Sequence, residues 1–66
     1  SYYDHLQITP QASKQDIKKA FYKLSMKYHP DRNHGDSSAH SQFIQINEAY
    51  DTLGGELKRR EYDRKL

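Results

Sequence analysis

The first long run of periodic apolar positions lies in the N-terminal half of the chain. Apolar residues recur every third or fourth position from Ile17 to Tyr28, which places them on one face of an α-helix. Ser13 precedes the run and Asp16 follows three residues later, the pattern of a capping box. Pro30 disfavours helical geometry in the residue before it. We therefore predict a helix that begins at Ser13 and ends near Tyr28.

A second periodic run extends from Ala39 to Leu53, with apolar residues spaced four, three, four and three positions apart. This spacing is typical of the apolar seam of packed helices. Asp36 or Ser37 can cap the start of this helix. We expect Gly54 and Gly55 to stop it, because glycine accepts the left-handed conformation common at helix ends.

Two shorter helices are predicted at the ends of the chain. Ser1 with Asp4 forms another capping pair, and the first helix is expected to run to about Ile8. Residues 9–12 contain a proline and read as a connector. The last helix is expected from about Glu56 to Arg64.

The two long helices are joined by a polar loop of about eight residues, from His29 to Asp36. A loop of this length favours antiparallel packing of its two helices. No strand pattern is present, so the predicted fold is all-α: an antiparallel hairpin of helices two and three, with short helices one and four covering its open side. The hairpin is expected to bury Ile17, Phe21, Leu24 and Tyr28 against Phe43, Ile46, Tyr50 and Leu53.

Size and composition make helix packing the expected source of stability. The 66 residues predict one small domain, 1–66, and the chain contains no cysteine for a disulfide or a thiolate metal site. No apolar run approaches the roughly 18 residues of a membrane span, so we expect no membrane contact. The domain is expected to be monomeric and to need no cofactor.

The net charge is only +2, but the positive charge is concentrated in the second helix. Residues 14–27 hold five lysines and one acid. Lys19, Lys23 and Lys27 form a row at i, i+4 spacing, where like charges repel by a few tenths of a kcal/mol, about 0.2–0.5, per pair. Tyr22 and Met26 fall on the side away from the apolar stripe. An exposed aromatic and an exposed thioether in a cationic face predict a docking surface for an acidic partner.

The most informative motif is His29-Pro30-Asp31, which follows the basic helix at the tip of the predicted hairpin. A structured tip with a fixed proline is well suited to presenting side chains to a partner. The motif, the basic helix before it, the segment Phe43–Tyr50 after it and Lys58-Arg59-Arg60-Glu61-Tyr62-Asp63 together resemble the J domain of the Hsp40 co-chaperones. The resemblance covers essentially the whole chain.

That resemblance implies a four-helix J domain that is not an enzyme. J domains bind Hsp70 ATPases through this loop and helix, stimulate ATP hydrolysis and promote client trapping and protein folding. Carried over by position, the expected partner-binding residues are His29, Pro30, Asp31, Arg32, Asn33, Lys18, Phe21, Tyr22, Lys23 and Lys27. Gln7 stands where the family usually has glycine, and Tyr22 where a basic residue is common. The residues near the C-terminal helix resemble small mitochondrial J proteins.

Other functions remain as alternatives. A J-like domain that only acts as a scaffold is one, and a small basic helical module that binds nucleic acid is another. Low net charge and the absence of interleaved arginine or asparagine in the basic helix disfavour base reading. Four histidines are scattered without i, i+4 pairs, so no metal site is predicted. Ser25, His29 and Asp31 are too crowded for a catalytic triad. The expected location is intracellular, either cytosolic or mitochondrial.

Overall fold

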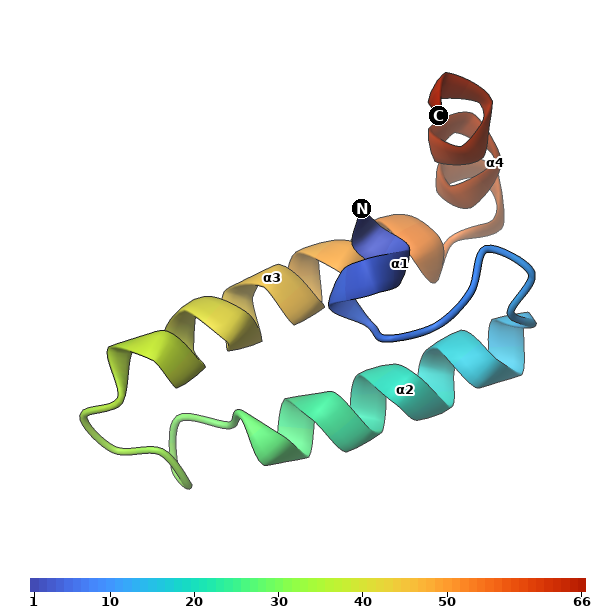
Figure 1. Ribbon diagram of the computed structural model, residues 1–66. Coiled ribbons are helices and arrows are strands. Elements are labelled where there is room, and N and C mark those ends of the chain that lie inside the picture. The colour runs from blue at the N-terminus through green and yellow to red at the C-terminus, as the bar shows by residue number, and fades with distance from the viewer.

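Four α-helices and no strand make up the fold in the computed structural model, which describes all residues 1–66 (Figure 1). The helices are α1 (Tyr2–His5), α2 (Lys14–Lys27), α3 (Ser37–Leu53) and α4 (Glu56–Lys65). The two long helices, α2 and α3, lie side by side and form the hairpin. The predicted all-α hairpin is confirmed.

Local sequence signals place both ends of α2 where they were predicted. The Ser13 hydroxyl accepts a hydrogen bond from the Asp16 backbone N–H at 3.1 Å, and the Asp16 carboxylate accepts one from the Ser13 N–H at 3.4 Å. This reciprocal capping box satisfies two donors that the first helical turn leaves free. The helix ends at Lys27 with Tyr28 as its C-cap, two residues before Pro30. At the start of α3, Asp36 is the cap.

Helix α1 is shorter than expected and ends at His5 instead of near Ile8. Gln7 has φ of 57°, in the left-handed region. Its N–H donates to the Asp4 carbonyl and the Ile8 N–H donates to the Tyr3 carbonyl, each at 3.0 Å. These two bonds form a Schellman motif, in which the left-handed residue is usually glycine. Gln7 therefore occupies that position at a conformational cost, which a glycine would avoid.

At the end of α3, glycine is needed at position 54 because a side chain would not fit there, and not because the backbone is left-handed. Gly54 has φ of −76° and Gly55 has φ of −101°, so the expected left-handed ending is wrong. A Cβ atom on Gly54 would lie 2.7 Å from the Tyr50 carbonyl oxygen and 3.0 Å from the Tyr50 ring. Gly54 therefore allows the chain to turn closely past the Tyr50 side chain before α4 begins.

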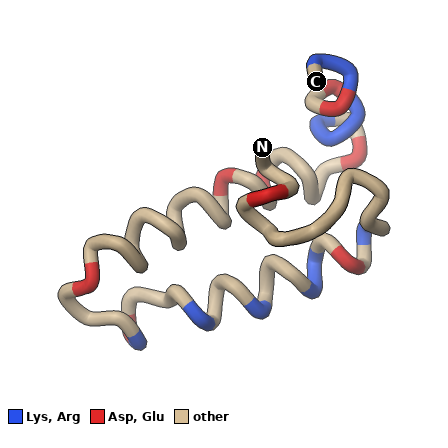
Figure 2. The backbone as a smooth tube through the Cα atoms, in the orientation of Figure 1, with Lys and Arg blue, Asp and Glu red and all other residues tan.

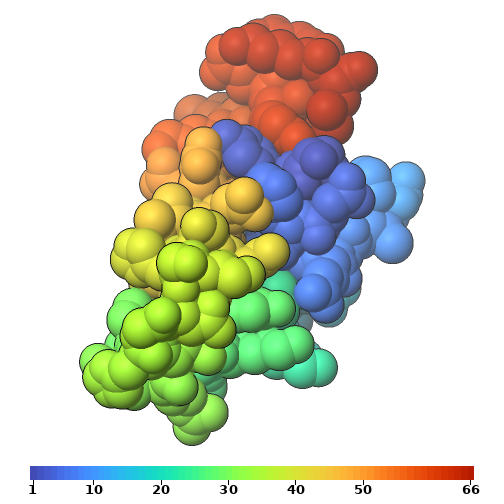
Figure 3. Space-filling model, turned by 60° about the vertical axis from the view of Figure 1, so that its left-hand side comes forward, coloured from blue at the N-terminus to red at the C-terminus, as the bar shows by residue number.

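The core is centred where α1 meets the hairpin. It contains Tyr3 and Leu6 from the α1 region together with Ile17, Leu24, Ile46, Ala49 and Leu53. The predicted hairpin core is confirmed at its four aliphatic positions, Ile17, Leu24, Ile46 and Leu53, whereas its four aromatic positions are less buried than expected. Phe21, Tyr28, Phe43 and Tyr50 are only half-buried, whereas Tyr3 and Leu6 from the α1 region are fully buried members of the core. Figure 3 shows α1, in blue, packed against the α3 side of the molecule.

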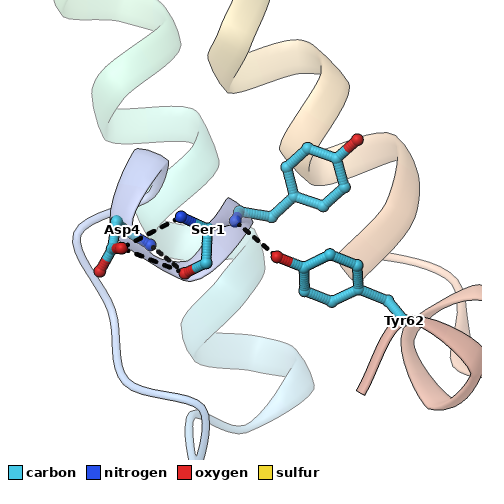
Figure 4. A network of polar contacts seen from close by, with 4 residues as sticks. Ser1, Asp4 and Tyr62 are labelled. Carbon is cyan, nitrogen blue, oxygen red and sulfur yellow. Dashed lines mark hydrogen bonds and ion pairs between the residues drawn. The ribbon is translucent and has the colours of Figure 1, made fainter. Parts of the chain in front are cut away.

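Helix α3 is central, because α1, α2 and α4 each pack against it. Helix α4 stands at the end of α3 and packs against it, so α1 and α4 both pack on the hairpin as predicted, although α4 contributes no fully buried residue. Side chains also attach it to the N-terminal region. The Tyr62 hydroxyl accepts a hydrogen bond from the Tyr2 backbone N–H at 3.0 Å, beside the Ser1–Asp4 cap of α1 (Figure 4).

A second connection holds α4 against the connector between α1 and α2. The Arg59 guanidinium donates to the carbonyl oxygens of Pro10, at 3.1 Å, and Ala12, at 2.6 Å. It also donates to the Tyr3 hydroxyl at 3.2 Å. One half-buried arginine therefore joins the last helix, the first helix and the connector. None of the four helices is long and apolar enough to span a membrane.

Candidate partner-binding site

The candidate site begins at the loop from His29 to Asp36, which forms the tip of the hairpin (Figure 1). Two consecutive turns shape its first half. The Arg32 N–H donates to the His29 carbonyl at 2.9 Å, and the Asn33 N–H donates to the Pro30 carbonyl at 3.2 Å. The proline ring fixes φ within the first turn. The tip is therefore an ordered turn that holds its side chains in defined directions.

The His29 side chain supports the loop through two contacts. Its Nδ1 accepts a hydrogen bond from the Asp31 backbone N–H at 3.1 Å, which requires an imidazole with an unprotonated Nδ1. Its ring meets the Phe43 ring edge-on, with centroids 5.6 Å apart. The ring is thus held between the loop and α3, which fixes the backbone at Asp31.

Asp31 points outward, and its side chain is 86% exposed. His29 Nδ1 lies 3.7 Å from the carboxylate but is the acceptor of the Asp31 N–H, and no lysine or arginine forms an ion pair with Asp31. The next residue, Arg32, is also exposed and unpaired. The tip therefore presents an anion and a cation in consecutive residues, and both are available to a partner.

The basic residues of α2 are exposed along its length, and the predicted cationic face is present. Figure 2 shows the lysine positions recurring along α2, whereas α3 contains no lysine or arginine. None of the five α2 lysines forms an ion pair. Lys23 and Lys27 also border a hollow between α2 and the turn after α1. Unpaired cations on one side of a small domain produce a local positive field despite the low net charge.

Aromatic and sulfur-containing side chains are interleaved with these lysines. Tyr22 is 53% exposed and Met26 is 58% exposed, as predicted for residues facing away from the core. The Lys18 ammonium lies 5.8 Å from the centre of the Tyr22 ring. Phe21 is half-buried and stacks on Tyr50 of α3. The face therefore combines charge with exposed apolar surface, a composition suited to protein recognition.

The predicted site residues do not form one tight cluster. His29, Pro30, Asp31, Arg32 and Asn33 lie together in the loop. Lys27 adjoins them at the end of α2, but Lys18 lies nine residues earlier, about 14 Å along the helix axis. The arrangement is an elongated surface with its acidic group at one end. Such a surface fits an extended protein partner better than a small molecule.

One contact in the loop was not foreseen from the sequence. The Asn33 side-chain amide donates to the carbonyl oxygens of Lys27 and His29, each at 2.9 Å. The contact forms because the loop folds back, which brings Asn33 close to the end of α2. Only the general preference of asparagine for turns and helix ends could have suggested it. Nowhere do three or more His, Asp or Glu side chains gather in a way that could hold a metal ion.

The family model and the relatives that match this chain all belong to one protein family. The model of the DnaJ domain family matches residues 1–63. The chain is 53% identical over 64 residues to the chaperone protein DnaJ of Campylobacter jejuni, covering 97% of this chain. It is 54% identical over 63 residues to the corresponding protein of Gluconobacter oxydans, covering 96% of this chain. In both cases the match spans 17% of the relative's length.

A solved structure has the same fold. The crystal structure of ERdj5 form II superimposes with a TM-score of 0.88 at 41% sequence identity, and the match covers 97% of this chain and 8% of that chain. Both the relatives and this structure are much longer than 66 residues, so the similarity concerns one part of each.

Proposed function

This chain belongs to the DnaJ domain family, and we propose that it acts as a co-chaperone module that binds an Hsp70 ATPase and stimulates its ATP hydrolysis. In this proposal the domain performs no chemistry itself. Hydrolysis in Hsp70 traps the client polypeptide, which promotes protein folding. The observation that carries the proposal is the exposed, unpaired Asp31 carboxylate at the ordered tip of the hairpin.

Asp31 is the proposed acceptor for a cationic group on Hsp70. Its carboxylate has no lysine or arginine partner in the domain itself. A charge-assisted hydrogen bond that becomes desolvated in a complex is worth about 2–5 kcal/mol when one partner is truncated. Pro30 and His29 contribute by fixing the backbone on which Asp31 stands, and Arg32 offers a second charged contact.

The exposed face of α2 is the proposed second half of the interface. Lys18, Lys23 and Lys27 supply positive charge that an acidic Hsp70 surface can neutralise. Tyr22, and Phe21 at the edge of the face, supply aromatic area of the kind that is enriched in protein interfaces. Because no carboxylate of the domain pairs with these lysines, docking does not first have to break an internal ion pair.

The test is single-turnover ATP hydrolysis by Hsp70 with and without the domain, beside the variants Asp31→Asn and Asp51→Asn. Both variants remove one negative charge, but Asp51 lies on α3, where its carboxylate contacts Lys58 at 3.5 Å. We expect stimulation by the native domain and by Asp51→Asn, and its loss in Asp31→Asn with helicity unchanged. Equal stimulation by both variants would count against the proposed contact.

Failure of the folded native domain to stimulate any Hsp70 would favour a scaffold function. Running the assay with cytosolic and mitochondrial Hsp70s also tests the proposed location, since a preference for one would indicate the compartment. Binding to nucleic acid is tested separately by a mobility shift with duplex DNA, which should be steeply salt-dependent if phosphate contacts are involved.

A further inference from the structure

Asn33 is unusual within the exposed hairpin tip. Every residue from His29 to Ser38 is exposed except Asn33, which is half-buried. A polar side chain that turns inward from an otherwise exposed loop needs hydrogen-bond partners there. The Asn33 amide has two, the Lys27 and His29 carbonyl oxygens.

These two acceptors belong to different parts of the site. The Lys27 carbonyl is one of the last four of α2, which have no partner within the helix. The His29 carbonyl lies in the loop, where it also accepts the Arg32 N–H. A side-chain amide carries two N–H donors, so Asn33 can serve both carbonyls at once. It thereby ties the end of the basic helix to the first residue of the tip.

The backbone of Asn33 extends the same connection in both directions. Its N–H donates to the Pro30 carbonyl at 3.2 Å, and its carbonyl accepts the Asp36 N–H at 3.1 Å. Asp36 in turn caps α3 by accepting the Ala39 N–H at 3.0 Å. Asn33 is therefore bonded to the end of α2, to the tip and to the cap of α3, and its amide nitrogen lies within hydrogen-bond distance of two carbonyl oxygens.

We infer that Asn33 is a positioning residue, which orients His29-Pro30-Asp31 relative to α2 from inside the loop and does not itself contact the partner. This inference rests on the proposed Hsp70-binding function and changes the role expected for Asn33 from its sequence position. Without the amide, the loop loses these two hydrogen bonds to the end of α2 and to His29, and Asp31 samples orientations in which it no longer lies in register with Lys23 and Lys27.

The chain offers a matched control in Asn47. Its side-chain amide also donates to a helix carbonyl, that of Phe43 at 2.8 Å, and it lies on the exposed surface of α3. The variants Asn33→Asp and Asn47→Asp each remove the amide donors and add one negative charge with little change in shape. The variants Asn33→Ala and Asn47→Ala remove the donors without adding charge, so the pair of substitutions separates positioning from electrostatic repulsion.

Two readouts are needed. One is the domain concentration that gives half-maximal stimulation of Hsp70. The other is amide hydrogen exchange at Asp31 and Arg32 in the free domain, measured by NMR. We expect both Asn33 variants to raise the half-maximal concentration on the order of tenfold, the scale of one or two lost hydrogen bonds. Loop amides should exchange faster by a similar factor, whereas both Asn47 variants should match the native domain in the two readouts.

Three results would overturn the inference. Weakened stimulation with unchanged exchange in the free domain would make Asn33 a contact residue. Native behaviour of both Asn33 variants in both readouts would show that the amide is dispensable. Weakened stimulation that follows a loss of helicity would make its role one of overall stability. If the native domain stimulates no Hsp70, the proposed function fails, and hydrogen exchange still decides whether Asn33 holds the loop.

Discussion

The rings of Phe21 and Tyr50 stack almost in parallel, with their centroids 4.1 Å apart and their planes at 11° to each other. The stack joins α2 to α3 at the edge of the core, where both side chains are half-buried. Phe21 therefore has a structural partner in the free domain as well as a place beside the proposed Hsp70 interface. The two roles can be separated by experiment.

A double-mutant cycle on Phe21→Ala and Tyr50→Ala should reveal coupling between the two rings. Aromatic pairs in this arrangement contribute about 0.5–1.5 kcal/mol beyond the area they bury. We expect the double variant to lose that much less free energy of unfolding than the sum of the single variants, measured by urea denaturation. Strict additivity of the two losses would show that the stack is not a stabilising contact.

Leu24→Ala should destabilise the domain by about 2–5 kcal/mol, because Leu24 is a buried member of the core. The total stability expected for 66 residues is only roughly 3–10 kcal/mol, so much of the protein should unfold. Met26→Ala, two residues along on the exposed side, provides the control and should change stability by less than about 0.5 kcal/mol. Comparable urea midpoints for the two variants would contradict the observed core.

Gln7→Gly should stabilise the domain. Gln7 is the single non-glycine residue with a positive φ, and a left-handed backbone costs an L-residue about 1–2 kcal/mol. Part of that gain is offset by the greater freedom of glycine in the unfolded chain, so we expect a net increase of up to about 1 kcal/mol in the free energy of unfolding. Gln11→Gly, in the connector, has no such strain to relieve and should not stabilise. A destabilised Gln7→Gly variant would refute this account.

Lys23→Glu should weaken Hsp70 binding mainly through electrostatics. The native interaction should therefore weaken as salt rises from low to physiological concentration, where charges more than about 8–10 Å apart are screened. Lys14→Glu makes the same charge change at the opposite end of α2 and should have the smaller effect. Binding curves that are indifferent to salt would count against a cationic docking face.

Stability should fall in strongly alkaline solution because of Tyr3. Burial and the hydrogen bond that its hydroxyl donates to Asp63 raise the pKa of Tyr3 above the ordinary value of 10.0, although Arg59 opposes this. A raised pKa in the folded state gives a contribution that is complete below the unfolded pKa and is lost as pH rises through the folded pKa.

The alkaline effect can be followed by tyrosinate absorbance and by unfolding at several pH values. Tyr3→Phe should remove one late-titrating tyrosine and flatten the fall in stability above about pH 10. Tyr2 titrates late as well, because its hydrogen bond to Glu48 raises its pKa. Tyr2→Phe is therefore the spectroscopic control. An unchanged alkaline profile in Tyr3→Phe would contradict the assignment.

The helices were predictable because their signals are local. Ser13 and Asp16 are three residues apart, and the apolar spacing that defines α2 and α3 is read within a few turns. Ile8 misled the prediction of α1, because its apolar side chain continued the pattern while the backbone at Gln7 had already turned. A local pattern of apolar residues does not reveal the φ angle of a single residue. Only the resemblance, in which glycine is usual at position 7, indicated that the backbone at Gln7 is unusual.

The pattern of apolar and polar residues could not predict contacts between residues that are far apart in the sequence. Arg59 bonds to carbonyl groups 47 and 49 positions away, and Asn33 faces inward because the loop folds back on α2. Likewise, the exposure of Tyr22 follows from helical periodicity, but the half-burial of Tyr28 and Phe43 does not, because their apolar spacing predicted full burial. The residues of the candidate site could therefore be proposed from the sequence, whereas the hydrogen bonds that hold the loop in shape could not.

The contacts of α4 with the N-terminal region also determine how the domain would respond to mechanical load. Tyr62 and Arg59 join the two ends of the fold directly, at the side remote from the hairpin tip (Figure 1). A pull applied between the first and last residues would load these side-chain bonds first. Tension would therefore pass across the base of the hairpin, and the loop that carries Asp31 would keep its shape until those bonds had failed.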